Sequence, residues 1–158
     1  MKWLVVLLAL MLCGCRTQET FETISDEPVE QVMAIPREIS VRLPDSAVAP
    51  VLESEERQVY FCEDYEIVIE TLASGDLDAT LRSISGFGRD QLTLMQTQWQ
   101  DVTRYEFVWA AAGEEGDRLG RGVILDDGKY HYCMSVLRDA DTVTQVVWRD
   151  VFASFALT

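Results

Sequence analysis

The chemically reactive side chains of this sequence are few, and histidine is the scarcest. His131, in the segment DDGKYHYC, is the single histidine. Together with Ser135 and Asp126 it could form a Ser-His-Asp triad, in which the imidazole takes a proton from the serine hydroxyl. No serine lies in the GxSxG turn that exposes the nucleophile in one large hydrolase class. We therefore expect His131 to face solvent or lie on an edge strand, and we predict no catalytic residue.

Acidic side chains form a second group that could do chemistry. Five of them come from two predicted turns: Glu114, Glu115, Asp117, Asp126 and Asp127. If these turns were neighbours, the carboxylates could supply the oxygen ligands that calcium prefers. The DxDxDG loop of calcium sites is absent, and turn geometry explains the Asp-Gly pair at 127–128. The favoured interpretation is a solvated acidic rim, so the sequence predicts neither a metal site nor a cofactor.

Two cysteines of the expected domain form a third group. Cys62 and Cys133 both fall in predicted strands. In an oxidising compartment they could form a disulfide, closing a loop of about 70 residues and stabilising the fold by roughly 2–4 kcal/mol. Buried free thiols are also common in strands. Both alternatives are open at the level of sequence, and zinc lacks enough cysteine and histidine ligands here.

The N-terminus reads MKWLVVLLALMLCGC, with Lys2 followed by an uninterrupted apolar run of nine residues from Leu4 to Leu12. A transmembrane helix needs about 20 apolar residues, so this run is typical of a secretory signal peptide. Its end, Leu12-Cys13-Gly14-Cys15, resembles the lipobox of bacterial lipoproteins. The resemblance implies that Cys15 is lipidated, that residues 1–14 are removed, and that the lipid holds the chain on the extracytoplasmic face of the cell membrane.

The remaining chain divides into two parts. Residues 15–37 are expected to combine the lipidated cysteine with a disordered acidic tether, and residues 38–158 to form a single domain. Phe21 is the only aromatic residue between positions 16 and 34. Such a segment buries too little apolar surface to offset the entropy lost on ordering.

Charge restricts the partners of this chain. Acidic residues outnumber basic ones by 27 to 13, which gives a net charge of −14. A surface of that sign repels phosphate backbones, so we expect no nucleic-acid partner. The glycine-rich segment GEEGDRLGRG at 113–122 departs from GxGxxG and carries acids that would repel a phosphate. We interpret it as a turn.

Alternating apolar and polar residues predict an antiparallel sheet. The pattern of Tyr65, Ile67 and Ile69 places them on one face, and the same holds for Tyr105, Phe107 and Trp109. Residues 45–57 are expected to form a loop. The expected strands are a short edge strand at 38–44, then 59–62, 65–72, 92–98, 103–112 and a hairpin turning at 127–128.

Two helices complete an α+β fold with helices packed on the sheet. The first is expected at 77–85, between a capping Asp76 and Gly86. The second is expected at 142–156. Its apolar stripe repeats at steps of four, through Val143, Val147, Val151 and Phe155.

Residues 59–157 resemble the PsbP-like fold, which is also seen in Mog-type proteins and in small lipoproteins of the DcrB group. The matching features are the helix after the first hairpin, the strand YEFVWAAA, the run GRGVILDDGKYHY, and a terminal helix with Trp148 and Phe155. The resemblance implies an antiparallel sheet between helices. It also implies a non-catalytic accessory or adaptor role, because most members act on partner proteins.

Together these features predict a membrane-anchored, extracytoplasmic lipoprotein that acts as a non-catalytic interaction module, with a protein partner of unknown identity. Trp99 lies in the polar stretch QTQWQD and is the expected contact residue, whereas Trp109 and Trp148 are expected in the core. One alternative is a lipoprotein that binds a small ligand or peptide in a cleft between sheet and helix. A more remote alternative is a hydrolase or metal-dependent enzyme.

Overall fold

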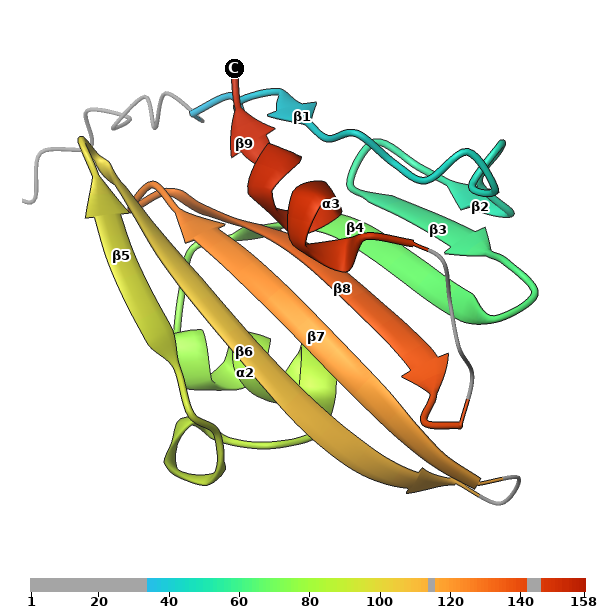
Figure 1. Ribbon diagram of the computed structural model, residues 1–158. Helices are drawn as coiled ribbons and strands as arrows, with labels where there is room; N and C mark the ends of the chain where they lie inside the picture. Colours follow the sequence, from blue (N-terminus) through green and yellow to red (C-terminus); the bar gives the residue numbers. More distant parts are fainter. Residues whose placement is uncertain (1–33, 114–115, 142–145) are drawn as a thin grey trace, which may run out of the picture. The chain divides into compact units, whose positions relative to one another are not determined.

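An antiparallel sheet with helices packed on it dominates the computed structural model, which describes residues 34–113, 116–141 and 146–158 (Figure 1). This confirms the predicted α+β class. The predicted signal peptide, Cys15 and most of the predicted tether lie outside the described residues. In the described part of the chain, no helix is long and apolar enough to cross a bilayer.

Seven strands form the main sheet in the order β2-β3-β4-β8-β7-β6-β5, and every neighbouring pair is antiparallel. A separate short pair joins β1 to β9. The elements in chain order are β1 (Ile39–Ser40), β2 (Leu52–Glu53), β3 (Arg57–Phe61), β4 (Tyr65–Ala73), α2 (Leu77–Ser85), the 3-10 turn η2 (Arg89–Gln91), β5 (Met95–Trp99), β6 (Val102–Gly113), β7 (Gly116–Asp126), β8 (Tyr130–Asp139), α3 (Trp148–Ser154) and β9 (Ala156–Leu157).

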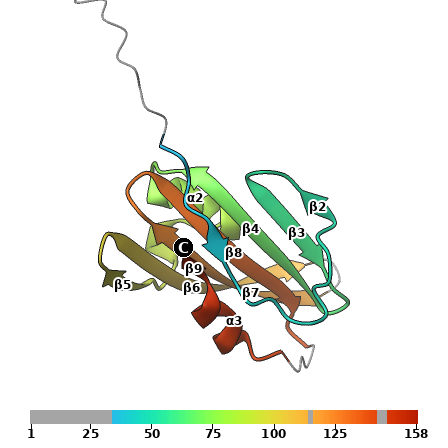
Figure 2. The same cartoon turned by 90° about the horizontal axis from the view of Figure 1, so that it is seen from above.

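The two helices lie on opposite sides of the sheet, as the view from above shows (Figure 2). We call these sides the α3 face and the α2 face. Because side chains alternate along a strand, the predicted row of Tyr65, Ile67 and Ile69 packs entirely on the α3 face. There it meets Val151 and Phe152 of α3 and Phe155, which directly follows the helix. The α2 face has a smaller core of Leu81, Phe107, Ile124 and Cys133.

Helix α2 has the predicted bounds because both of its ends are encoded locally. The Asp76 carboxylate accepts a hydrogen bond of 3.0 Å from the Asp78 amide, which satisfies one free donor of the first turn. Gly86 ends the helix at φ 81°, and its amide donates to the Arg82 carbonyl. Glycine adopts this left-handed conformation without a steric penalty.

The C-terminal helix is shorter than the predicted 142–156. It begins at Trp148 and ends at Ser154. Val147 precedes the helix and is 57% exposed, whereas Val143 lies outside the described residues. After the helix, Phe155 is buried in the core and the next two residues pair with β1. The pairing with a strand more than 100 residues away therefore replaces the last turn that the four-residue spacing predicted.

The segment GEEGDRLGRG is also corrected, since most of it belongs to β7 and not to a turn. Two of its glycines face aromatic residues of β6: Gly120 pairs with Trp109, and Gly122 pairs with Phe107. A Cβ atom on Gly120 would lie 2.0 Å from the Trp109 ring, and one on Gly122 would lie 2.5 Å from the Phe107 ring. The Trp109 and Phe107 rings lie over Gly120 and Gly122 of β7, in space that the Cβ atom of any other residue would fill.

Candidate functional site

His131 is buried in the centre of the sheet, which corrects the prediction of a solvent-facing or edge position. It is 1% exposed and lies on β8, between β4 and β7. Its Nδ1 atom is 2.8 Å from the Thr80 hydroxyl of α2. Its Nε2 atom is 3.7 Å from an Asp126 oxygen and has no hydrogen-bond partner among the described residues.

The triad considered from the sequence is therefore not assembled. Ser135 pairs with Gly122 and Val68 farther along β8, and Thr80 occupies the place beside the imidazole. Thr80 is 7% exposed, and its hydroxyl is engaged by the His131 ring. The Thr80–His131 contact joins α2 to the sheet and has a structural role.

The acidic residues of the predicted rim do not converge either. Asp117 and Asp126 lie at opposite ends of β7, roughly 30 Å apart at the rise of a β-strand. The two turns are therefore not neighbours, which contradicts the premise of a calcium site; Glu114 and Glu115 lie outside the described residues. Within residues 34–113, 116–141 and 146–158, no three potential metal ligands form a group.

Asp127 has a local structural role instead. Its carboxylate accepts hydrogen bonds from the amides of Lys129 and Tyr130 and from the Tyr132 hydroxyl, at 2.8–2.9 Å. Burial alone would raise the pKa of Asp127, but these hydrogen bonds together hold it below its ordinary value. The carboxylate thus organises the β7–β8 turn.

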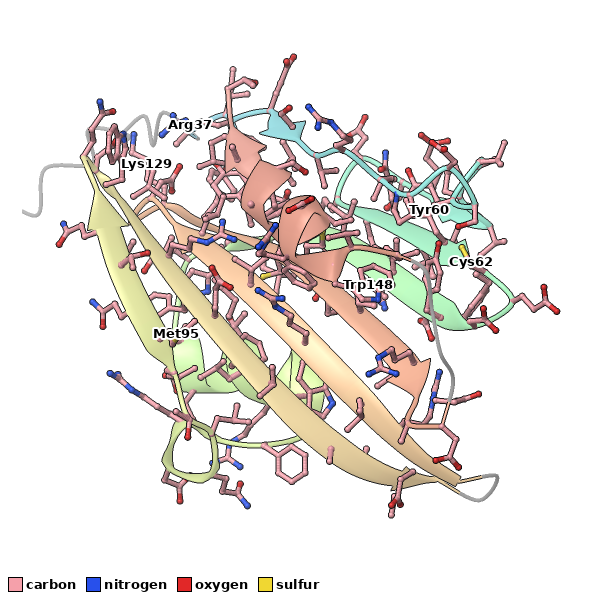
Figure 3. All side chains as sticks on the ribbon, in the orientation of Figure 1. Arg37, Tyr60, Cys62, Met95, Lys129 and Trp148 are labelled. Carbon is pink, nitrogen blue, oxygen red and sulfur yellow. The ribbon has the colours of Figure 1, made fainter. Side chains whose placement is uncertain are left out.

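Of the two alternatives that the sequence left open, the structure has the free thiols: Cys62 and Cys133 form no disulfide. Cys62, directly after β3, packs against the core of the α3 face (Figure 3), whereas Cys133 is buried in the core of the α2 face. The sheet separates the two sulfur atoms. Burial raises the pKa of the Cys133 thiol far above its ordinary value, which favours the thiol over the reactive thiolate.

A groove of about 590 Å³ lies beside α3, and we call it the α3 groove. It exists because the elements differ in length. The seven residues of α3 span about 10 Å, whereas the twelve residues of β6 span roughly 40 Å. The helix therefore covers only part of the α3 face. The lining residues are Val108, Trp109, Ala110, Leu119, Gly120, Arg121, Val136, Arg138, Trp148 and Phe152.

Apolar side chains in this groove are accessible. Val108 is 64% exposed and Leu119 is 37% exposed. Trp148 closes the groove at the start of α3, where its ring meets Tyr65 edge-on with centroids 4.8 Å apart (Figure 3). Exposed apolar residues that adjoin one another in a concavity are typical of a binding surface.

Two arginines add positive charge to the α3 groove. Arg121 lies with its guanidinium carbon 4.3 Å above the Phe152 ring, a geometry that favours a cation. Arg121 also donates a 2.9 Å hydrogen bond to Glu106. Arg138 lies on the adjacent strand β8. A cleft between sheet and helix was considered from the sequence, but none of these lining residues was named as its wall, although the alternation of Arg104 and Glu106 with the aromatic residues of β6 indicates a polar row on this face.

Glu106 and Arg104 connect the groove to the end of α3. Arg104 donates to the carbonyls of Phe152 and Phe155 at 2.7 and 3.1 Å, and to Glu106 at 2.8 Å. Burial would raise the pKa of Glu106, but hydrogen bonds from Arg104 and Arg121 outweigh it, and the pKa lies below its ordinary value of 4.5. Glu106 thus stays ionised and holds Arg104 and Arg121 in place.

We expect Glu106→Gln to lower the free energy of unfolding by about 2 kcal/mol at pH 7, because hydrogen bonds to a charged group contribute most. The pKa of Glu106 is lower in the folded chain than in the unfolded chain. Ionised Glu106 therefore stabilises the fold at pH values above its unfolded-state pKa, and this stabilisation is lost as the pH falls through its folded-state pKa. The difference from wild type should therefore shrink below about pH 4. Urea unfolding between neutral and acidic pH measures it, with the exposed Glu55→Gln as control; a difference independent of pH would contradict the assignment.

Trp99 is 77% exposed at the end of β5, which confirms the predicted exposure. It lines a second hollow of about 430 Å³ together with Arg37, Arg104 and the C-terminal residues Phe155 and Leu157. Its role as a partner contact stays a prediction. Trp109 and Trp148 pack against the two cores as expected.

No protein-family model matches the chain, and no curated protein or solved structure matches it either. The PsbP-like resemblance therefore stays a prediction from sequence pattern. Function must be argued from the geometry and charge of the sites themselves.

Proposed function

We propose that the chain is a lipid-anchored protein on the extracytoplasmic face of a bacterial cell membrane, and that its folded unit binds a partner protein without catalysing a reaction. The N-terminal pattern ending in Leu12-Cys13-Gly14-Cys15 supports the anchor. Stable attachment needs about two lipid chains, and a lipoprotein cysteine carries at least that number.

The α3 groove is the observation that supports the binding role. It combines exposed apolar side chains with two arginines, in a chain whose net charge is −14. A partner segment with apolar side chains and a carboxylate would match both features. The apolar part would displace water from Val108 and Leu119, while the carboxylate would meet Arg121 or Arg138.

A small amphiphilic carboxylate is the second candidate ligand. The volume of the groove, about 590 Å³, lies within the range of small-molecule sites, about 300–1,000 Å³. An acyl chain or aromatic ring would lie along the apolar wall, with its carboxylate at the arginines. This candidate corresponds to the ligand-binding lipoprotein considered from the sequence.

The test is an affinity pull-down of the full chain from solubilised membranes, comparing wild type with Leu119→Asp. Placing a carboxylate in the apolar wall is expected to weaken binding of a groove partner at least about tenfold. Val48→Asp is the matched control, because Val48 is 88% exposed in a loop and does not line the groove. A partner retained equally by all three proteins would show that the α3 groove is not the binding surface.

The second candidate ligand gives a different result. If no protein co-purifies, but medium-chain carboxylates raise the melting temperature of wild type and Val48→Asp and not of Leu119→Asp, the groove binds a small ligand. The corresponding alcohols serve as controls, because they keep the apolar part and lack the charge that Arg121 and Arg138 would recognise.

A further inference from the structure

β5 forms one edge of the main sheet (Figure 1), and all five of its side chains are exposed. Edge strands normally carry charges, prolines or bulges that prevent pairing with another chain. The sequence of β5, MQTQW, has neither a charge nor a proline. The opposite edge differs, because β2 is two residues long and includes Glu53. Among the described residues, no strand pairs with the outer side of β5.

The free hydrogen-bonding groups of this edge follow from its hairpin. β5 and β6 pair from Trp99 and Val102 outward, with two residues between them. In an antiparallel ladder, alternate residues direct their backbone groups toward the partner strand and away from it. Trp99 and Val102, which close the hairpin, hydrogen-bond to each other. The backbone groups of Gln96 and Gln98 therefore point away from β6, to the free edge.

We propose that β5 pairs antiparallel with β5 of a second copy, around a twofold axis at Thr97. In this register Gln96 lies opposite Gln98 of the second copy, so the outward backbone groups of both strands meet. Thr97 lies opposite its own counterpart, and Met95 lies opposite Trp99 of the second copy. A twofold interface must be self-complementary, and the order apolar, Gln, Thr, Gln, apolar reads the same in both directions.

The side chains in this register are compatible on both faces. On one face Met95 and Trp99, which are 63% and 77% exposed, form two sulfur–aromatic pairs that cover apolar surface. Figure 3 shows Met95 at this outer strand. Two threonines meet between these pairs, and on the other face the glutamine amides can hydrogen-bond to one another.

Charge and area are consistent with a weak dimer. Two copies of net charge −14 repel at long range, but β5 is uncharged, and the charged residues opposite it on β6, Arg104 and Glu106, form an ion pair with each other. Pairing would bury two tryptophans, two methionines and the strand edges, roughly 1,000 Å² in total, which is at the low end for a specific interface. We therefore expect a micromolar dissociation constant. The inference does not depend on the lipid anchor or on the α3 groove.

Cysteine cross-linking tests the register in the full chain. Residues facing each other at a non-hydrogen-bonded position are about 4.5 Å apart at Cα, which suits a disulfide. Thr97→Cys is therefore expected to give a disulfide-linked dimer on a non-reducing gel. Gln98→Cys is the matched control, because two copies of this position lie diagonally, more than about 7 Å apart. No dimer from Thr97→Cys, or equal amounts from both variants, would overturn the proposal.

Sedimentation of the variants in detergent provides a second test that does not depend on oxidation. The variant Gln96→Lys with Gln98→Lys places like charges opposite each other and should raise the dissociation constant at least about tenfold. The variant Gln96→Lys with Gln98→Glu places opposite charges together and should dimerise like wild type. A wild-type chain that is monomeric at about 100 μM, well above a micromolar dissociation constant, overturns the proposal. The proposal is also overturned if an unrelated protein binds β5 of the wild type and fails to bind the double lysine variant.

Discussion

Gly120→Ala is expected to lower the free energy of unfolding by about 2–4 kcal/mol, one of the largest single-methyl effects available in this fold. The added Cβ would lie 2.0 Å from the Trp109 ring. That ring stacks on Phe107 with centroids 5.6 Å apart and packs against the core of the α2 face. The ring must leave its position, so the variant adds a steric clash and removes aromatic packing. Urea unfolding followed by circular dichroism measures the loss.

Two further variants identify the ring as the cause. Gly75→Ala should stay within about 0.5 kcal/mol of wild type, because a Cβ there has no atom within 4 Å. Trp109→Ala removes the obstacle, so adding Gly120→Ala to it should cost little more than Trp109→Ala alone. Full additivity of the two single losses would show that the ring does not lie across Gly120.

The features predicted correctly from the sequence are those specified by neighbouring residues. Asp76 and Gly86 define both ends of α2 with hydrogen bonds that span only a few positions. The row of Tyr65, Ile67 and Ile69 needs only the two-residue period of a strand to reach one face. Such signals do not depend on which strands become neighbours.

The features missed depend on strand order. From the sequence alone we expect an exposed His131, because a lone histidine in a polar stretch gives no sign of which strands and helices will pack against it. The order β4-β8-β7 places it between two strands and beneath α2, beside Thr80. In the same way, Cys62 and Cys133 each lie at or near a predicted strand, but the assembled sheet puts them on opposite sides. Local patterns predict strands and leave their arrangement open.

A cleft between sheet and helix was considered from the sequence, but the position of the α3 groove was not predicted, for a related reason. Its existence depends on the mismatch between a short helix and the long β6–β7 hairpin. The four-residue spacing of valines predicted a helix of twice the observed length, which would have covered more of the sheet. The observed helix begins only at Trp148, and Val108 and Leu119 lie beside this start of the helix and stay accessible.

Cys15→Ser is expected to abolish incorporation of a fatty-acid analogue into the full chain, an all-or-none effect. The thiol of Cys15 is the attachment point that the lipobox resemblance implies, and serine has no thiol to accept the lipid. Mass spectrometry of the wild type should show loss of residues 1–14 and the added lipid mass. Serine at this position should block both changes and leave the signal peptide in place.

Cys13→Ser is the matched control, because it changes the neighbouring cysteine and keeps a small residue before Gly14. It should label and process like wild type. Equal labelling of Cys15→Ser and wild type would place the lipid elsewhere, and an unlabelled wild type that retains residues 1–14 would mean a signal anchor. An apolar run of nine residues is well short of the roughly 20 that span a bilayer, so the proposed membrane attachment depends on the lipid. Neither result would alter the test of the α3 groove, which uses variants that leave the N-terminus unchanged.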